Sequence, residues 1–209
     1  MREILPGIHH WTAHDDELGA PVSSYYIEPA GALVDPMVPD EGLEAFDGLA
    51  TPQQVVLTNH HHYRQSDRFR DAFGCALRGP APARDALADR DVRPFWFGDE
   101  VAPGVTAVEI GVIGEDETAL HVTHAGGAIV FADGLVRPAG VLGYPSDADL
   151  GVHPLRKKKG LKEAFGGLLL RDFDALLFAH GEPMTDDGKA ALRRFVELPV
   201  EYPEYGPYA

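Results

Sequence analysis

The order of apolar and polar positions in the first half of the chain predicts strands followed by helices. Short apolar runs, bounded by turn-forming residues such as Pro29-Ala30, have the composition of strands. A helix is predicted over Pro39 to Leu49, and an amphipathic helix over Ser66 to Phe73. The predicted strands are residues 7–11, 22–28, 31–35, 54–58 and 75–77. Residues 54–58 form a nearly continuous apolar run, which is typical of a strand buried in a parallel sheet.

The second half repeats this order of elements. Strands are predicted at residues 105–109, 118–122, 128–133 and 175–181, and helices at residues 160–171 and 186–197. Residues 123–127, with the sequence Thr-His-Ala-Gly-Gly, have the composition of a hairpin turn. Two similar halves, each with strands followed by helices, predict an α/β fold of two packed sheets with helices outside. Because no repeat or linker interrupts the pattern, we expect a single domain over residues 1–209.

Composition narrows the class of protein. The chain has 209 residues, of which 44% are hydrophobic, and this suffices for one domain with a sizeable buried core. No run of about 18 apolar residues occurs, so we expect no membrane partner. The N-terminal residues do not resemble a secretory signal, and the only cysteine, Cys75, cannot form an internal disulfide. These features favour a cytoplasmic location.

The charge of the chain weighs against one class of partner. The formal net charge is −15 at pH 7, which repels phosphate backbones. Nucleic-acid binding draws most of its affinity from Lys and Arg side chains that neutralise phosphates. We therefore expect a small-molecule ligand or substrate and no nucleic acid, while the sequence leaves the oligomeric state open.

Residues that can ligate a metal lie at or just past the ends of three of the predicted buried strands. They are the run Asn59 to His62, then Asp133 and His180, the last two each followed by a glycine. Functional sites in α/β proteins collect where strand ends and loops converge. We therefore expect these three strand ends to meet in one cleft.

The same residues resemble the metallo-β-lactamase superfamily. Residues 57–64, Leu-Thr-Asn-His-His-His-Tyr-Arg, are similar to its first metal motif, TxHxHxDH. Residues 131–135 resemble the strand end that carries its bridging aspartate, and residues 178–183 resemble its last histidine motif. The likeness extends from about Leu5 to Phe195. It implies a four-layer αββα sandwich of metallo-β-lactamase type.

Compared with that motif, the first metal-binding segment has lost ligands. The resemblance places Asn59 at the first histidine, His61 at the second, Tyr63 at the aspartate and Arg64 at the following histidine. A guanidinium does not deprotonate in proteins, so Arg64 cannot ligate a metal. Its fixed positive charge also disfavours a nearby dication.

The third histidine of the family has two possible positions. In one alignment His124 takes this place. In the other, residues 117–122 and 128–133 form the hairpin that precedes Asp133, and His124 is only a turn residue. The third ligand would then fall near residues 112–114, Val-Ile-Gly, which carry no ligating side chain. We favour the second alignment because it keeps the hairpin.

The residues that remain are His61, Asp133 and His180, as candidate metal ligands and catalytic groups. With Asn59 as a weak oxygen donor, we expect these residues to hold either no metal or one zinc or iron ion with a position open for water. Asp133 is also a candidate general base. In a metal-free alternative, Asp133 pairs with Arg64 through two hydrogen bonds, and the two histidines surround this pair.

Two functions are consistent with this set. The resemblance implies a hydrolase of a small ester, thioester or lactone with at most one metal ion. The alternative is a non-catalytic protein that binds a small anionic ligand through Arg64, with Tyr63 and Asn59 beside it, or that serves as an interaction partner. The nuclease branch of the superfamily conflicts with the charge of −15 and with the lost ligands.

Overall fold

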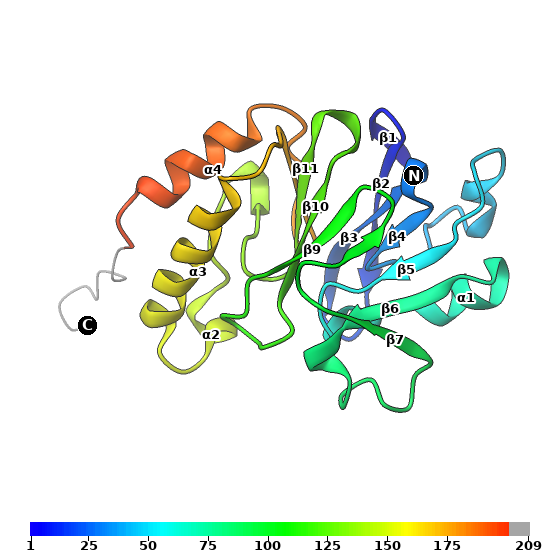
Figure 1. Ribbon diagram of the computed structural model, residues 1–209, viewed down its shortest axis with the longest axis horizontal. Helices are drawn as coiled ribbons and strands as arrows, with labels where there is room; N and C mark the ends of the chain where they lie inside the picture. The colour runs from blue at the N-terminus through cyan, green and yellow to red at the C-terminus, as the bar shows by residue number, and fades with distance from the viewer. Residues whose placement is uncertain (201–209) are drawn as a thin grey trace.

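The computed structural model describes residues 1–200, in which two facing β-sheets are covered by helices on their outer sides (Figure 1). The first sheet has seven strands, in the order β1 (Arg2–Leu5), β2 (Ile8–Asp15), β3 (Ala20–Ile27), β4 (Ala32–Val34), β5 (Gln54–Val56), β6 (Ala76–Pro80) and β7 (Val92–Phe95). The second has five strands, in the order β12 (Ala175–Phe178), β11 (Ala128–Phe131), β10 (Thr118–Val122), β9 (Val105–Glu109) and β8 (Glu100–Ala102).

The α-helices form the two outer layers. Helix α1 (Ser66–Phe73) packs on β5 and β6 of the first sheet, whereas α2 (Asp147–Leu150), α3 (Pro154–Leu168) and α4 (Gly188–Glu197) lie on the side of the second sheet. Short 3-10 turns complete the described elements: η1 (Glu28–Ala30), η2 (Leu43–Phe46), η3 (His61–Tyr63), η4 (Ala81–Ala83), η5 (His124–Gly126) and η6 (Pro138–Gly140). The predicted four-layer αββα architecture is confirmed.

Side-chain alternation along the strands fills three apolar layers. In β11, Val130 points into the core between the two sheets, whereas Ile129 and Phe131 point toward α3. Phe131 meets Phe165 of α3 edge to face, with ring centroids 5.4 Å apart. Strands buried on both faces need apolar residues at successive positions, which explains the unbroken apolar runs of β11 and β12. A third layer lies between the first sheet and α1, around Phe69.

Strand direction decides where the polar loops lie. Strands β1 to β4 are antiparallel neighbours, but β4, β5, β6 and β7 pair in parallel, and so do β11 and β12. The segments that follow β4 and β5 therefore leave one end of the first sheet together. The segments that follow β11 and β12 likewise leave the second sheet together.

The structure differs from the sequence prediction at a few elements. Only a 3-10 turn, η2, forms within the helix predicted over Pro39 to Leu49, and Gly42 just before it has a φ of 79°. The helix predicted from Gly160 begins earlier, with Pro154 in its first turn, where a missing N–H costs no hydrogen bond. Strands β1, β7 and β8, at the edges of the sheets, were not predicted. Within residues 1–200, no helix has the length and apolar character that crossing a membrane requires.

Candidate metal centre

The ends of the two sheets are joined where the polar loops leave them. The backbone N–H of Thr118, at the start of β10, donates to the carbonyl oxygen of Thr58 after β5, at 3.0 Å. The N–H of Ser23 in β3 donates to the carbonyl oxygen of Ala179 after β12, at 2.9 Å. These bonds bring the segments that follow β5 and β12 against the opposite sheet. The predicted convergence of strand ends is therefore found in the structure.

Three side chains meet at this junction: His62, Asp133 and His180. Their ligand atoms all lie within 4.8 Å of one another. The Oδ1 atom of Asp133 is 3.1 Å from Nε2 of His62 and 2.9 Å from Nε2 of His180. The side chain of His62 is 6% exposed, whereas those of Asp133 and His180 are 28% and 25% exposed. One side of the cluster is thus open to solvent.

A glycine lets His180 reach this cluster. Gly181 has a φ of 118°, and a Cβ at this position would overlap the backbone carbonyl of Arg137. The N–H of Arg137 in turn donates to the carbonyl oxygen of His180 at 3.0 Å. The glycine that follows His180 therefore permits this close approach of the two backbones, and a residue with a side chain would not fit there.

The second histidine of the cluster is not the predicted one. The sequence prediction assigned His61, but the structure places His62 beside Asp133 and leaves His61 exposed. The His61 ring is tilted against that of His60, with ring centroids 3.8 Å apart. The prediction aligned the family motif one residue too early: with Thr58 at the threonine of TxHxHxDH, its two histidines fall at His60 and His62. In the structure β5 ends at Val56 and the chain turns into η3, so side chains of this segment do not alternate between two faces as they would in a strand. His61 is therefore replaced by His62 as candidate ligand and catalytic group.

Asp35 fixes the orientation of the His62 ring. The Nδ1 atom of His62 lies 3.0 Å from Oδ2 of Asp35 and 2.9 Å from Oγ1 of Thr58. The hydroxyl of Thr58 donates to Asp35, and so does the Thr58 backbone N–H, at 2.8 Å. Burial alone would lower the pKa of His62, but the carboxylates of Asp133 and Asp35 outweigh it and raise this pKa to about 9.

The amide of Asn59 presents a nitrogen, and not an oxygen, to the cluster. Its Oδ1 accepts a hydrogen bond from the backbone N–H of His62 at 3.0 Å, and this bond fixes the amide orientation. Nδ2 therefore donates to Oδ2 of Asp133, at 2.8 Å. The prediction of Asn59 as a weak oxygen ligand is wrong in this arrangement, because its oxygen already accepts the N–H.

A buried glutamate, which the sequence prediction missed, holds the loop that carries Asp133. Oε1 of Glu117 accepts the backbone N–H groups of Asp133 at 3.0 Å and of Gly134 at 2.7 Å. Burial and the nearby charge of Asp133 raise the pKa of Glu117 to about 7. Burial would also raise the pKa of Asp133, but the positive charge of His62 and hydrogen bonds from both histidines hold it well below its usual range.

Arg64 and Tyr63 do not occupy the positions expected of them. Nη1 of Arg64 donates to the backbone carbonyl oxygens of Ser23 at 2.9 Å and Asp35 at 2.7 Å. Within residues 1–200, no hydrogen bond or ion pair links Arg64 to Asp133, so the predicted two-bond pair is wrong. Tyr63 packs in the core layer near α1, and its hydroxyl donates to Asp67 at 2.6 Å. Tyr63 therefore does not bind at the cluster.

His124 lies far from the cluster. It belongs to η5, the turn between the antiparallel strands β10 and β11, and Asp133 follows the opposite end of β11. Nε2 of His124 is 2.8 Å from the carbonyl oxygen of Pro103. The alignment that treats residues 117–133 as a hairpin is confirmed, and His124 is excluded as a ligand to the same ion as Asp133.

The donor set fits one metal ion. Two imidazole nitrogens and one carboxylate oxygen are a common ligand set for zinc and for iron(II). A hydrogen bond from the other ring nitrogen to a carboxylate, as in His62 and Asp35, is typical of metal-ligating histidines. Around the second oxygen of Asp133, however, the structure places the amide nitrogen of Asn59. This amide and the nearby charge of Arg64 disfavour a second ion.

Comparisons with known proteins support the fold. No family model matches the chain, and a search of curated proteins finds no match either. Among solved structures, a metallo-β-lactamase family protein from Thermus thermophilus is 17% identical, with 93% of this chain and 80% of that chain covered and a TM-score of 0.62. The metallo-β-lactamase FIM-1 from Pseudomonas aeruginosa in its mono-zinc form is 15% identical, with 93% of each chain covered and a TM-score of 0.64.

A third similar structure is an archaeal metallo-β-lactamase superfamily protein from Sulfolobus tokodaii. It is 13% identical, with 97% of this chain and 90% of that chain covered and a TM-score of 0.63. Identities this low establish the architecture alone, since one fold hosts many functions. The chain has the metallo-β-lactamase fold.

Proposed function

We propose that this chain binds one divalent metal ion, zinc or iron(II), through Nε2 of His62, Oδ1 of Asp133 and Nε2 of His180, and that it hydrolyses a small ester, thioester or lactone. The observation that carries the proposal is the close approach of these three ligand atoms, within 4.8 Å of one another. The orientation of His62 by Asp35 supports it, because a preorganised ring costs less to bind.

Each residue has a distinct part in this proposal. A bound ion of this kind lowers the pKa of a water ligand toward 7 and polarises a carbonyl group. Asp35 holds the Nδ1 proton of His62, so that Nε2 is the nitrogen free to ligate. Asn59 and Glu117 fix the side chain and the backbone of Asp133. His180 and Asp133 line the side that solvent and a substrate reach.

The proposal includes a small-molecule substrate and a cytoplasmic location. The net charge of −15 supports the exclusion of nucleic acid, since phosphates would be repelled. A single cysteine, buried in the structure, is consistent with a reducing compartment.

One observation favours a second candidate, a non-catalytic protein that binds a small anion. The Nε and Nη2 atoms of Arg64 are buried and have no hydrogen-bond partner among residues 1–200. These two atoms form one edge of the guanidinium, which matches a carboxylate or a phosphate with two parallel hydrogen bonds. Binding of an anion to this edge would satisfy both donors.

Turnover of a generic ester, p-nitrophenyl acetate, tests the proposed function. We expect protein loaded with one equivalent of zinc to hydrolyse it faster than chelator-treated protein. We expect Asp133→Asn and His180→Ala to lose this gain, and His61→Ala, at the exposed neighbouring histidine, to retain it. Equal rates with and without metal would refute the hydrolase. A thermal shift with acetate or phosphate that Arg64→Ala abolishes, together with no turnover, would support the anion-binding candidate.

A further inference from the structure

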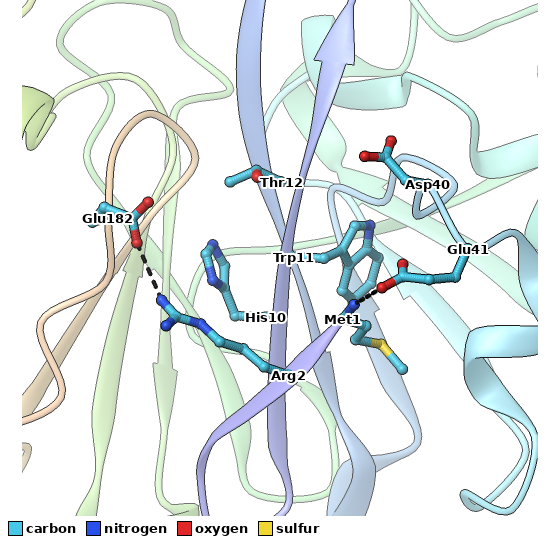
Figure 2. A pocket seen from close by; sticks show the side chains of 8 residues that line it. All are labelled: Met1, Arg2, His10, Trp11, Thr12, Asp40, Glu41 and Glu182. Carbon is cyan, nitrogen blue, oxygen red and sulfur yellow. Dashed lines mark hydrogen bonds and ion pairs between the residues drawn. The ribbon is translucent and has the colours of Figure 1, made fainter.

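A groove with a volume of about 450 Å³ lies beside the proposed metal centre, outside its ligand set. It lies between strands β1 and β2 of the first sheet and the loop that follows His180. Its walls include Arg2, His10, Asp40 and Glu182 (Figure 2). None of these residues contributes to the proposed metal ligands. The groove therefore needs an explanation of its own.

His10 presents an unpaired hydrogen-bond acceptor in this groove. The hydroxyl of Ser23 donates to the carbonyl oxygen of Gly181 at 3.1 Å, so its only hydrogen is used. Ser23 Oγ must therefore accept from Nε2 of His10, which lies 3.0 Å away. Burial, together with the charges of Arg2 and the N-terminus, lowers the pKa of His10 to about 4, so the ring is neutral near pH 7.

The neutral ring has its hydrogen on Nε2, and Nδ1 consequently carries a lone pair. His10 is 3% exposed, and within the described part of the chain its Nδ1 has no hydrogen-bond partner. A buried acceptor without a partner destabilises the protein relative to a paired one. A ligand that brings an N–H donor to Nδ1 would remove this cost.

The charges that line the groove favour a cation. Three carboxylates line it, from Asp40, Glu41 and Glu182, and Arg2 is the only Lys or Arg side chain among its described walls. Glu41 is paired with the amino group of Met1 at 2.7 Å, whereas Asp40 has no cationic partner within residues 1–200.

The second ion pair in the groove, between Arg2 and Glu182, can be broken by a ligand. Arg2 lies 3.2 Å from Glu182, and the two side chains are 66% and 60% exposed. An exposed ion pair of this kind contributes little to stability, so a ligand can displace Arg2 from Glu182. Figure 2 shows the His10 ring beside this pair, so displacement of Arg2 also uncovers the ring.

We propose that this groove binds a small organic cation of the alkylammonium class, with one ammonium N–H donating to Nδ1 of His10 and the positive charge against Glu182. The site does not depend on a metal ion. It is connected to the proposed metal centre through Ser23, which contacts His10 on one side and the Gly181 backbone, next to His180, on the other.

Titration with n-butylammonium, followed by NMR of the histidine side-chain nitrogens, tests this proposal. Butyrate, of similar size and opposite charge, is the matched probe. We expect a saturable shift of the His10 Nδ1 resonance with n-butylammonium, with a dissociation constant on the order of 10 mM, and none with butyrate. Equal responses to the two probes, or no saturable response to the ammonium, would overturn the proposal.

Substitutions in the groove test where n-butylammonium binds. We expect His10→Phe to weaken n-butylammonium binding at least tenfold and Arg2→Ala to strengthen it several-fold, because Arg2 competes for Glu182. His14→Phe, at a histidine whose side chain is 60% exposed and lies outside the groove, is the control and should bind as wild type does. If His10→Phe does not fold, Glu182→Gln at the exposed groove wall serves instead, with binding expected to weaken several-fold. Wild-type affinity in either variant would contradict the site.

Discussion

The Nε2 atom of His62 lies 3.1 Å from Oδ1 of Asp133, and this contact joins the segments that follow β5 and β11. Because Asp35 lies on the other side of the ring, His62 is held between two carboxylates. Such a position attracts a positive charge, either a proton on the ring or a metal ion bound to Nε2. The two carboxylates raise the pKa of His62 to about 9, so the ring keeps this proton near pH 7 in the metal-free protein.

This raised pKa predicts how the stability of the metal-free protein depends on pH. A histidine whose folded pKa exceeds its unfolded value of 6.5 stabilises the fold fully below pH 6.5, and the contribution disappears as the pH rises through about 9. The loss should be on the order of 3 kcal/mol. Urea unfolding in the presence of a chelator, from pH 6 to pH 10, measures it. His62→Gln should lack this component of the pH dependence; an unchanged profile in the variant would show that another group is responsible.

Glu117 should matter for stability although it is not a proposed ligand. Glu117→Ala leaves the buried N–H groups of Asp133 and Gly134 without their acceptor, so we expect unfolding free energy at pH 6 to fall by about 2 kcal/mol. The neighbouring Glu115 is exposed, and Glu115→Ala should change the unfolding free energy by less than about 0.5 kcal/mol. Urea denaturation of the two variants gives the comparison. Similar losses in both would argue against a bonded role for Glu117.

The backbone of Arg64 predicts an unusual order of variant stabilities. Its φ of 45° and ψ of −126° suit glycine, whereas a Cβ makes this conformation costly. Arg64→Gly and Arg64→Ala both lose the hydrogen bonds to Ser23 and Asp35, so they differ mainly in this strain. We expect the glycine variant to be more stable than the alanine variant by about 1 kcal/mol, measured by thermal or urea unfolding. An alanine variant of equal or greater stability would contradict the strained backbone.

The fold could be predicted because the spacing of apolar residues, and the succession of strands and helices along the chain, can be read directly from the sequence. The hairpin of β10 and β11 and the strand β12 were predicted at or close to their observed bounds. The edge strands β1, β7 and β8 were missed because short strands at the margin of a sheet lack a continuous apolar run.

The site could be predicted only in part. Asp133 and His180 directly follow buried strands, so their position is fixed by strands that the sequence reveals. The choice between His61 and His62 depends on the register of the family motif, and aligning its threonine with Thr58 would have selected His62. Asp35 stands at the end of the predicted strand of residues 31–35, as Asp133 and His180 stand at the ends of theirs, and this signal could have identified it as a residue of the site. Glu117 precedes a strand, and its contact with Asp133 comes from tertiary packing alone.

Metal content of two neighbouring histidine variants tests the central claim most directly. Purified wild type, His62→Ala and His61→Ala are each dialysed against zinc, washed, and measured by elemental analysis. We predict about one equivalent of zinc in wild type and in His61→Ala, and a loss of at least tenfold in His62→Ala, because only His62 lies against Asp133 and His180. Loss of zinc in His61→Ala with retention in His62→Ala, or two tightly held ions in wild type, would contradict this account.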